Sequence, residues 1–315
     1  MDQAKQAQSP PNGEAEPKPA ATSDAIDVVR LRYWQHLLNE MLKRKQFKIP
    51  VHLAFGHEAA AVALSRCVQA HDAVCLTHRN VAYNLARSGS LDVILEHYRL
   101  TSKPNLPGLM GSMNLAAEET SIAYASSILG NNLPVAAGIA LNRKLAGRPG
   151  VVFVLTGDGG IEEGAFWETL VFARSHRLGL VVIVENDNHS MSSTIAQRRS
   201  GIDLALVCKG LGVRYGYAIG SVLADARTAI SAARTDASGG DPACVELALT
   251  TFNQHAGPTP GWPEDPLRIA LEDGLLVKDA PEDPVYHVWR ALGNAAFQQL
   301  ATQIMEMDRR ENYLH

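Results

Sequence analysis

The sequence has few cysteines and no pair of them at metal-binding spacing. Its 315 residues include four, and none belongs to a CxxC motif: Cys67, Cys75, Cys208 and Cys244. Four thiols cannot form a disulfide framework in a chain of this length, and structural zinc sites require closely spaced pairs of cysteine. We therefore expect core or surface thiols, with no disulfide scaffold and no cysteine-based zinc site.

The sequence also lacks a large net charge, a long apolar run and an apolar leader. Acidic residues number 33 and basic residues 29, so the formal charge of −4 gives no field that attracts nucleic acid or anionic lipid. The longest apolar runs, such as residues 151–155, are far shorter than the roughly 20 residues that span a bilayer. No apolar stretch follows Lys5, as a secretory signal would require. We expect a cytoplasmic chain that binds neither membranes nor nucleic acid.

Composition predicts a disordered tail followed by two ordered regions. Residues 1–23 are rich in proline, alanine, glutamine and glutamate and have almost no large apolar side chain, so burial cannot offset the entropy of ordering them. From Asp24 onward, apolar side chains recur at helical spacing. We expect an α/β domain over residues 24–263 and a helical extension over residues 264–315. A single helix at 285–307 is expected there, with one apolar face: Val288, Trp289, Leu292, Ala296, Leu300, Ile304 and Met307.

Residues 133–250 alternate between helical and strand patterns. The two central strands, at 151–155 and 180–185, are continuous apolar runs rich in β-branched residues, as strands covered on both faces are. Further strands are expected at 215–219 and 243–250, and helices at 133–145, 163–176, 204–211 and 225–235. This βαβ pattern predicts a three-layer α/β fold, in which helices flank a parallel sheet of five or six strands.

The region before that alternation is less regular. Residues 56–100 have a mostly helical pattern, with a turn near His71. Residues 102–125 contain two prolines and two glycines with little periodicity, which predicts a long ordered loop. Loops of that length in compact domains are usually functional or disordered.

Polar side chains follow the two central strands. TGDGG, which contains Asp158, follows the first strand, and NDNHS, which contains Asn188, follows the second. Because one βαβ unit separates them, both segments reach the same edge of a parallel sheet, where ligands bind. Carboxylate, amide and carbonyl oxygens suit magnesium, and Gly157, Gly159 and Gly160 let a phosphate approach the backbone. The pair of segments predicts a magnesium diphosphate site, whereas GDGG alone would equally suit an ordinary strand-to-helix turn.

Several segments, taken in order, resemble one enzyme family. They are HLAFGHEAAAVAL, the pair His78-Arg79, GLMGSMN, SSILGNNLPVAAGIAL, GDGGIEEGAFWETLVFA and ENDN. Residues 24–261 thereby resemble the α subunit of the first component of thiamine diphosphate-dependent 2-oxo acid dehydrogenases, the pyruvate, branched-chain and acetoin dehydrogenase group. The resemblance implies the thiamine diphosphate-binding fold, thiamine diphosphate and magnesium as cofactors, and a small 2-oxo acid or ketone as substrate.

The resemblance also assigns metal ligands. Asp158 matches the family's metal-binding aspartate, Asn188 its asparagine, and Ser190 the residue whose carbonyl completes the set. The dehydrogenase α subunits usually place the asparagine one residue earlier, at the position of Asp187, whereas NDN with asparagine last is similar to transketolase-like members. We prefer Asn188 because a further negative charge beside a diphosphate would be repelled. The choice between Asp187 and Asn188 stays open.

Other residues match positions that contact the cofactor or the substrate. Arg79 matches the diphosphate-binding arginine, a role that suits its fixed fork of donors. His255 matches an active-site histidine, and such a group can shuttle protons near neutral pH. Asn114, which cannot titrate, stands where relatives have histidine. The remaining expected cofactor contacts are His78, where many relatives have tyrosine, the backbone of Ser127 and Leu129, and Gly159 and Gly160.

The resemblance further implies a partner chain. In this superfamily the glutamate that activates the cofactor belongs to a second, pyrimidine-binding domain, for which one βαβ series in 315 residues leaves no room. We therefore expect a β subunit in an α2β2 assembly, with residues 104–125 and the last helix as candidate interfaces. Three functions stay open: the α subunit of a 2-oxo acid or acetoin dehydrogenase, which is an oxidoreductase; the diphosphate-binding subunit of a split transketolase-like carboligase; and a non-catalytic relative. The substrate and the acyl acceptor, a lipoyl carrier or an aldehyde, are not determined.

Overall fold

The structure is a computed structural model that describes residues 22–47, 49–98, 120–259, 268–270 and 276–308. Nearly all of the expected tail and most of the expected loop at 102–125, including Asn114, lie outside these residues. None of the described helices combines the length and the apolar character needed to cross a membrane.

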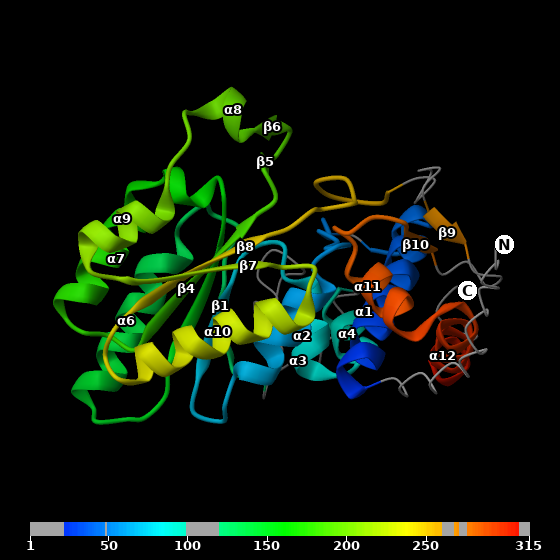
Figure 1. The fold of residues 1–315 in the computed structure, drawn as a ribbon, viewed down its shortest axis with the longest axis horizontal. Coiled ribbons are helices and arrows are strands. Elements are labelled where there is room, and N and C mark those ends of the chain that lie inside the picture. Colours follow the sequence, from blue (N-terminus) through cyan, green and yellow to red (C-terminus); the bar gives the residue numbers. More distant parts are fainter. Residues whose placement is uncertain (1–21, 48, 99–119, 260–267, 271–275, 309–315) are drawn as a thin grey trace, which may run out of the picture.

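Within the described ranges, six parallel strands form the central sheet, in the order β2-β1-β3-β4-β8-β7 (Figure 1). The strands are β1 (Ala73–Leu76), β2 (Ile122–Ala125), β3 (Val152–Gly157), β4 (Leu180–Asn186), β7 (Arg214–Ile219) and β8 (Ala243–Ala248). The predicted parallel sheet flanked by helices is confirmed. β1 lies in a stretch expected to be helical, because four apolar residues are too few to show a period and only pairing with β2 and β3 identifies them as a strand.

Side chains of the central strands alternate between two hydrophobic cores. Val154 and Val182 belong to the core on one face, whereas Phe153 and Ile183 belong to the core on the other. The first core is covered by α6 (Asn132–Leu145), α7 (Gly164–Ser175) and α9 (Leu204–Leu211). The second is covered by α2 (Glu58–Cys67), α3 (Val81–Ser88) and α10 (Leu223–Ser238). Because successive strand residues point to opposite faces, a strand covered on both faces must be apolar throughout.

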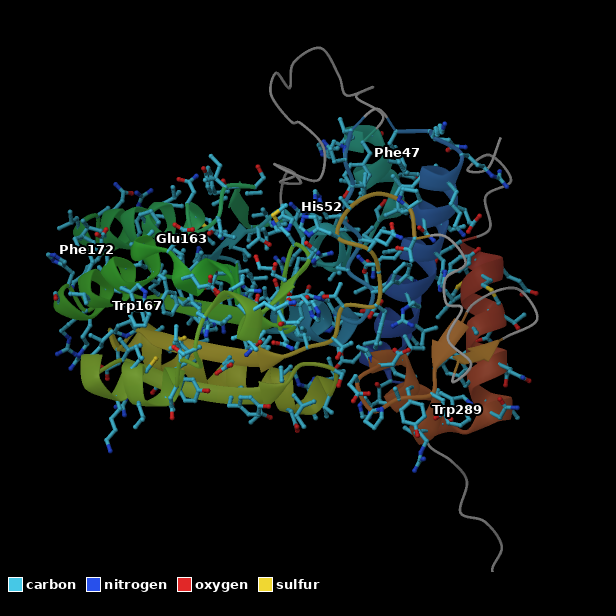
Figure 2. The ribbon with its side chains drawn as sticks, turned by 90° about the horizontal axis from the view of Figure 1, so that it is seen from above. Phe47, His52, Glu163, Trp167, Phe172 and Trp289 are labelled. Atoms are coloured by element: carbon cyan, nitrogen blue, oxygen red, sulfur yellow. The ribbon has the colours of Figure 1, made fainter. Side chains whose placement is uncertain are left out.

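A further layer of helices packs behind α2 and α3 on the second face. It consists of α1 (Ser23–Lys43), α4 (Leu91–Tyr98), α11 (Pro284–Leu292) and α12 (Asn294–Met307). In Figure 2, Trp289 of α11 therefore lies at the opposite end of the molecule from Phe172 of α7. The C-terminal helices belong to the same hydrophobic core as α1.

The single helix expected at 285–307 is wrong, because the chain breaks at Gly293. This residue has φ 79° and ψ 164°, a conformation that glycine adopts without steric cost, and it separates α11 from α12. The break resets the helical phase. Phe297 and Ile304 of α12 are fully buried, whereas Ala296 and Met307, both expected on the buried face, are exposed.

Short elements follow the end of β4. The antiparallel pair β5 (His189–Ser190) and β6 (Ser193–Thr194) leads into the short helix α8 (Ile195–Arg198), which begins with a capping box formed by Thr194 and Gln197. Figure 1 shows this segment projecting beyond the carboxyl end of the sheet. Elements of two to four residues are too short to produce a periodic pattern, so only the structure reveals them. A second small pair, β9 (Arg268–Ala270) and β10 (Leu276–Lys278), precedes α11.

Candidate active site

A cavity of about 380 Å³ lies at the carboxyl ends of the strands. Its walls come from the segments that follow β1, β2, β3, β4 and β8 and from the segment before α2. The carboxyl ends of the strands are the edge where open parallel sheets bind ligands. All the residues expected to form the site line this cavity except Asn188. They are His78, Arg79, Ser127, Leu129, Asp158, Gly159, Gly160, Ser190 and His255.

The turn after β3 holds a buried carboxylate against a bare backbone. Asp158 is only 2% exposed, and its pKa is raised first by burial and then by the negative charge of Asp187. A Cβ atom built on Gly159 would collide with the hydroxyl of Ser190, and one on Gly160 with the hydroxyl of Thr156. A side chain at either position would have to displace the neighbouring Ser190 or Thr156, so glycine keeps backbone rather than side chain beside Asp158.

Asp187, rather than Asn188, shares the cavity with Asp158. Asn188 has a positive φ of 63°, and its Oδ1 atom accepts a hydrogen bond of 3.3 Å from the backbone N–H of Ile195, outside the cavity. The carboxylate of Asp187 accepts hydrogen bonds from the backbone N–H of His189, at 3.1 Å, and from the hydroxyl of Thr251. Of the two candidate ligands, the structure brings only Asp187 into the cavity that holds Asp158.

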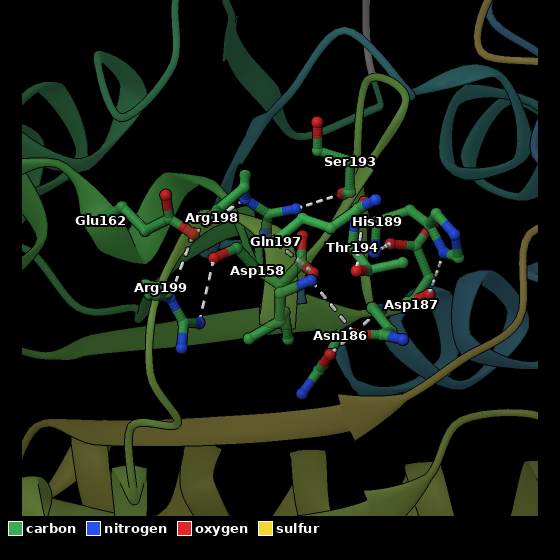
Figure 3. Close-up of polar contacts among 12 residues, drawn as sticks. Asp158, Glu162, Asn186, Asp187, His189, Ser193, Thr194, Gln197, Arg198 and Arg199 are labelled. Carbon is green, nitrogen blue, oxygen red and sulfur yellow. Dashed lines mark hydrogen bonds and ion pairs between the residues drawn. The ribbon is translucent and has the colours of Figure 1, made fainter.

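Two arginines from the end of α8 reach the turn after β3 (Figure 3). Arg198 places Nη2 3.2 Å from Oδ2 of Asp158 and donates from Nε to Glu162 at 3.0 Å. Arg199 donates from Nε to the same Glu162 oxygen at 3.0 Å. Arg198 and Asp158 thus form an ion pair, and the positive charge of Arg198 opposes the rise in the pKa of Asp158. Nothing in the sequence indicated a role for Arg198, because this residue lies 40 positions after Asp158 in the chain and only folding brings the two together.

Arg79 is fixed by backbone groups on two other segments. Its guanidinium donates to the carbonyl of Leu53 and, at 3.5 Å, to the carbonyl of His255. Burial lowers the pKa of Arg79, whereas the carboxylates of Asp187 and Glu185 oppose this shift. A buried arginine held at its inner edge by carbonyls can present its remaining donors to an anion in the cavity.

Three histidines from distant segments meet at the cavity wall. His52 precedes α2, His78 follows β1 and His255 follows β8, and their ring centroids lie 4.8 to 5.5 Å apart. Burial and then Arg79 lower the pKa of His52 to about 4 and that of His78 to about 3, and the same causes lower the pKa of His255. All three imidazoles are therefore neutral at pH 7. Figure 2 shows His52 near the middle of the molecule.

His52 was not singled out by sequence reasoning, although it opens the segment HLAFGHEA. A lone histidine before a helix gives no signal of its own. Only the convergence of three chain segments at one edge of the sheet brings it beside His78 and His255.

A second group missed by sequence reasoning is a buried hydrogen-bonded chain that ends at Asp187. Oε1 of Glu185 accepts a hydrogen bond of 2.6 Å from the hydroxyl of Tyr83 and lies 2.8 Å from Nδ1 of His57. Nε2 of His57 lies 2.8 Å from the hydroxyl of Thr251, which in turn donates to Asp187. The chain links α2, α3 and β4 to Asp187 and so fixes that carboxylate in place.

Comparison with known proteins gives relatives of low identity. The chain is 25% identical over 178 residues to the pyruvate dehydrogenase E1 component subunit alpha-1 of Arabidopsis thaliana. The aligned region is 55% of this chain and 46% of the relative. It is 28% identical over 144 residues to the α subunit of acetoin:2,6-dichlorophenolindophenol oxidoreductase of Cupriavidus necator. This aligned region is 46% of this chain and 43% of that relative. This chain thus matches about half the length of these curated relatives.

Solved structures and a family model extend the comparison. A transketolase from Pichia stipitis has a similar fold, with a TM-score of 0.55 and 17% identity over 91% of this chain and 46% of the transketolase chain. The family model described as the dehydrogenase E1 component matches residues 28–250. This match covers more than half of the chain, so the chain belongs to the dehydrogenase E1 component family.

Proposed function

We propose that this chain is the α subunit of a thiamine diphosphate-dependent 2-oxo acid or acetoin dehydrogenase. The observation that carries the proposal is the turn after β3, where a buried Asp158 adjoins the bare backbone of Gly159 and Gly160 in the cavity that also holds Arg79. Membership of the dehydrogenase E1 component family supports the same function.

The residues of the cavity fit magnesium and a diphosphate. Asp158 and Asp187 line the same cavity, and the charge of Asp187 raises the pKa of Asp158, so a divalent cation between them would relieve an unfavourable interaction. In our proposal these two carboxylates and the backbone carbonyl of Ser190 hold the metal, with Asn188 as the alternative to Asp187. The cofactor contacts are those expected from the sequence: His78, Arg79, Ser127, Leu129, Gly159 and Gly160.

The protein's own part in the reaction is to bind, orient and move protons. Bound thiamine diphosphate would supply a carbon nucleophile that adds to a carbonyl and then an electron sink. Arg79 would orient the diphosphate through its fixed fork, and Asp158 would hold it through the metal. His255, which is neutral at pH 7, would hydrogen-bond to the substrate carbonyl oxygen and move a proton to or from that atom.

The same proposal includes a β subunit that carries the pyrimidine-binding domain, in an α2β2 assembly. Of the two interfaces expected from the sequence, residues 104–119 lie outside the described residues. The other, the helix expected at 285–307, is divided into α11 and α12, and Phe297 and Ala301 of α12 pack in the same core as α1. Only the exposed face of α12 is therefore available to a partner.

The test is a calorimetric titration of thiamine diphosphate into the chain together with its co-purifying partner, with and without magnesium. We expect magnesium-dependent uptake and turnover of 2-oxo acids or acetoin with an artificial electron acceptor. Full turnover by this chain alone would refute the proposal that a partner is needed. The mass of a co-purifying chain would help to identify the partner. Absence of cofactor uptake in the presence of the partner would indicate the non-catalytic relative instead.

Two sequence features favour a second function, the diphosphate-binding subunit of a split transketolase-like carboligase. Asn114 cannot titrate where relatives have histidine, and NDN with asparagine last is similar to transketolase-like members. This function would pass the acyl or two-carbon unit to an aldehyde rather than to a lipoyl carrier. Product formation with aldehyde acceptors, without reduction of the artificial acceptor, would favour it over the dehydrogenase.

A further inference from the structure

The three histidines of the cavity wall form a compact set of nitrogen ligands. One ring nitrogen each of His52, His78 and His255 lies within 4.8 Å of the other two. The three come from three chain segments that meet where β1 and β8 end, so the cluster depends on the fold and not on a local motif. All three side chains line the cavity at the carboxyl ends of the strands.

We propose that His52, His78 and His255 bind a transition-metal ion of the zinc class, at a site separate from the one proposed for magnesium. Zinc binds histidine nitrogen at about 2.0–2.1 Å in tetrahedral geometry, so its ligand nitrogens stand roughly 3.4 Å apart. Side-chain rotations that move each ligand nitrogen by about 1 Å would bring the three nitrogens to that separation. Because all three histidines line the cavity, a water or a substrate oxygen there would complete the four ligands.

The chemistry of the donor set separates this site from that of Asp158. Magnesium prefers oxygen ligands and octahedral geometry, whereas imidazole suits zinc, cobalt, nickel and copper. The three rings are neutral at pH 7, so binding there displaces no proton. The opposing feature is the positive charge of Arg79, which the nearby carboxylates of Asp187 and Glu185 offset.

Metal at this cluster has a consequence for the cavity. An ion bound to His255 would occupy the lone pair with which this histidine exchanges protons, and it would narrow the space beside Arg79. Zinc would therefore act as an inhibitor that competes with substrate. This consequence rests on the proposed function, whereas binding of the metal does not.

The test is titration of cobalt(II) into the full-length chain without thiamine diphosphate. We expect one ion per chain, the intense visible absorption typical of tetrahedral cobalt, and displacement by one equivalent of zinc but not by excess magnesium. His52→Ala, His255→Ala and His78→Tyr should each weaken binding at least tenfold. The tyrosine variant keeps a ring at position 78, and circular dichroism and thermal melting establish that each variant is folded.

Two control variants test whether the ion binds at the histidine cluster rather than elsewhere in the cavity. His189→Ala removes a histidine that lines the same cavity outside the cluster, and Asp158→Ala removes the carboxylate of the proposed magnesium site. Both should bind cobalt as the wild type does. Absence of the tetrahedral spectrum, wild-type affinity in the three cluster variants, or loss of the spectrum in Asp158→Ala would each overturn the proposal. Failure of magnesium-dependent cofactor uptake would overturn only the proposed function.

Discussion

Two groups of buried charge differ in how completely they are paired. In the helical layer, the guanidinium of Arg32 donates to Glu58 and Asp283 at 2.8 to 3.2 Å, and all three side chains are 0% exposed. Gln35 and the backbone N–H of Gly56 also donate to Glu58. This charged triplet, Arg32, Glu58 and Asp283, ties α1 and α2 to the start of α11.

The group at the end of the sheet is incompletely paired. Asp158 and Asp187 line the same cavity, and Asp158 shares its cation, Arg198, with Glu162. The triplet needs nothing from outside the chain, whereas the carboxylates at the sheet end retain the capacity to bind a cation. The difference teaches that incomplete pairing of buried charge, more than burial itself, indicates a ligand site.

Breaking the triplet should have the largest effect on stability. Arg32→Met leaves Glu58 and Asp283 buried without their cation, and we expect the free energy of unfolding to fall by about 3–5 kcal/mol in denaturant titrations. Arg30→Met is the matched control on the same helix, since Arg30 makes partly exposed ion pairs worth about 0–1 kcal/mol. Equal losses in the two variants would remove the distinction between the triplet and a surface pair.

Changing Asp158 should affect ligand binding instead. We expect Asp158→Asn to weaken magnesium-dependent uptake of thiamine diphosphate by at least about 100-fold, or about 2.8 kcal/mol, measured by calorimetry. Asp225→Asn, which removes an exposed carboxylate from α10, is the control and should bind normally. Unchanged affinity in Asp158→Asn would contradict the metal assignment.

A pair of variants decides between the neighbouring candidate ligands. Because Asp187 lines the cavity and Asn188 turns to Ile195, we expect Asp187→Ala to weaken magnesium binding by about tenfold, or about 1.4 kcal/mol, and Asn188→Ala to change it by less than about twofold. The measurement is the same titration. The reverse ranking would restore Asn188 as the ligand.

Removing the protein's own cation should strengthen metal binding. Arg198 competes with a metal for the charge of Asp158, so Arg198→Gln should raise magnesium affinity by about threefold, which is about 0.65 kcal/mol. Lys209→Gln, on the exposed face of α9, serves as the control. Weaker binding in Arg198→Gln would show that the arginine organises the site rather than competes for it.

The smallest expected effect concerns the pH dependence of the metal-free chain. The pKa of Asp158 in the folded protein is raised above its ordinary value of 3.8, so this group stabilises the fold at low pH and loses that contribution as the pH rises through its folded pKa. Asp158→Asn should therefore be slightly more stable than the wild type near pH 7 without metal, and the difference should shrink toward pH 4. Thermal melting across this range would detect it, and a variant that is less stable at pH 7 would contradict the sign.

The sequence predicted strands β3, β4, β7 and β8 because their signal is local. It missed β1, in a stretch expected to be helical, and β2, in the stretch 102–125 expected to be a loop. Both central strands are apolar over the predicted runs, and the helix between them, α7, begins and ends within one residue of its expected bounds. The helix break at Gly293 was missed because one glycine is compatible with a helix, and its positive φ is visible only in the structure. β1 and the pair β5 and β6 are too short for any period to emerge.

In the candidate site too, residues with a local signal in the sequence were predicted, and residues that depend on distant partners were not. Asp158 and its glycines were identified because they form one motif, and Arg79 and His255 because their segments resemble the family. His52, Glu185, Arg198 and the chain through His57 were not, since each gains meaning only from a partner far away along the chain.

The sequence by itself determined which faces are apolar, where the strands end and which motif follows β3, because burial and turn chemistry act over a few neighbouring residues. The tertiary structure alone decided that Asp187 rather than Asn188 enters the cavity, that Arg198 lies on Asp158, and that three histidines meet. These outcomes depend on the relative placement of distant segments, which packing of the whole sheet and its helices fixes.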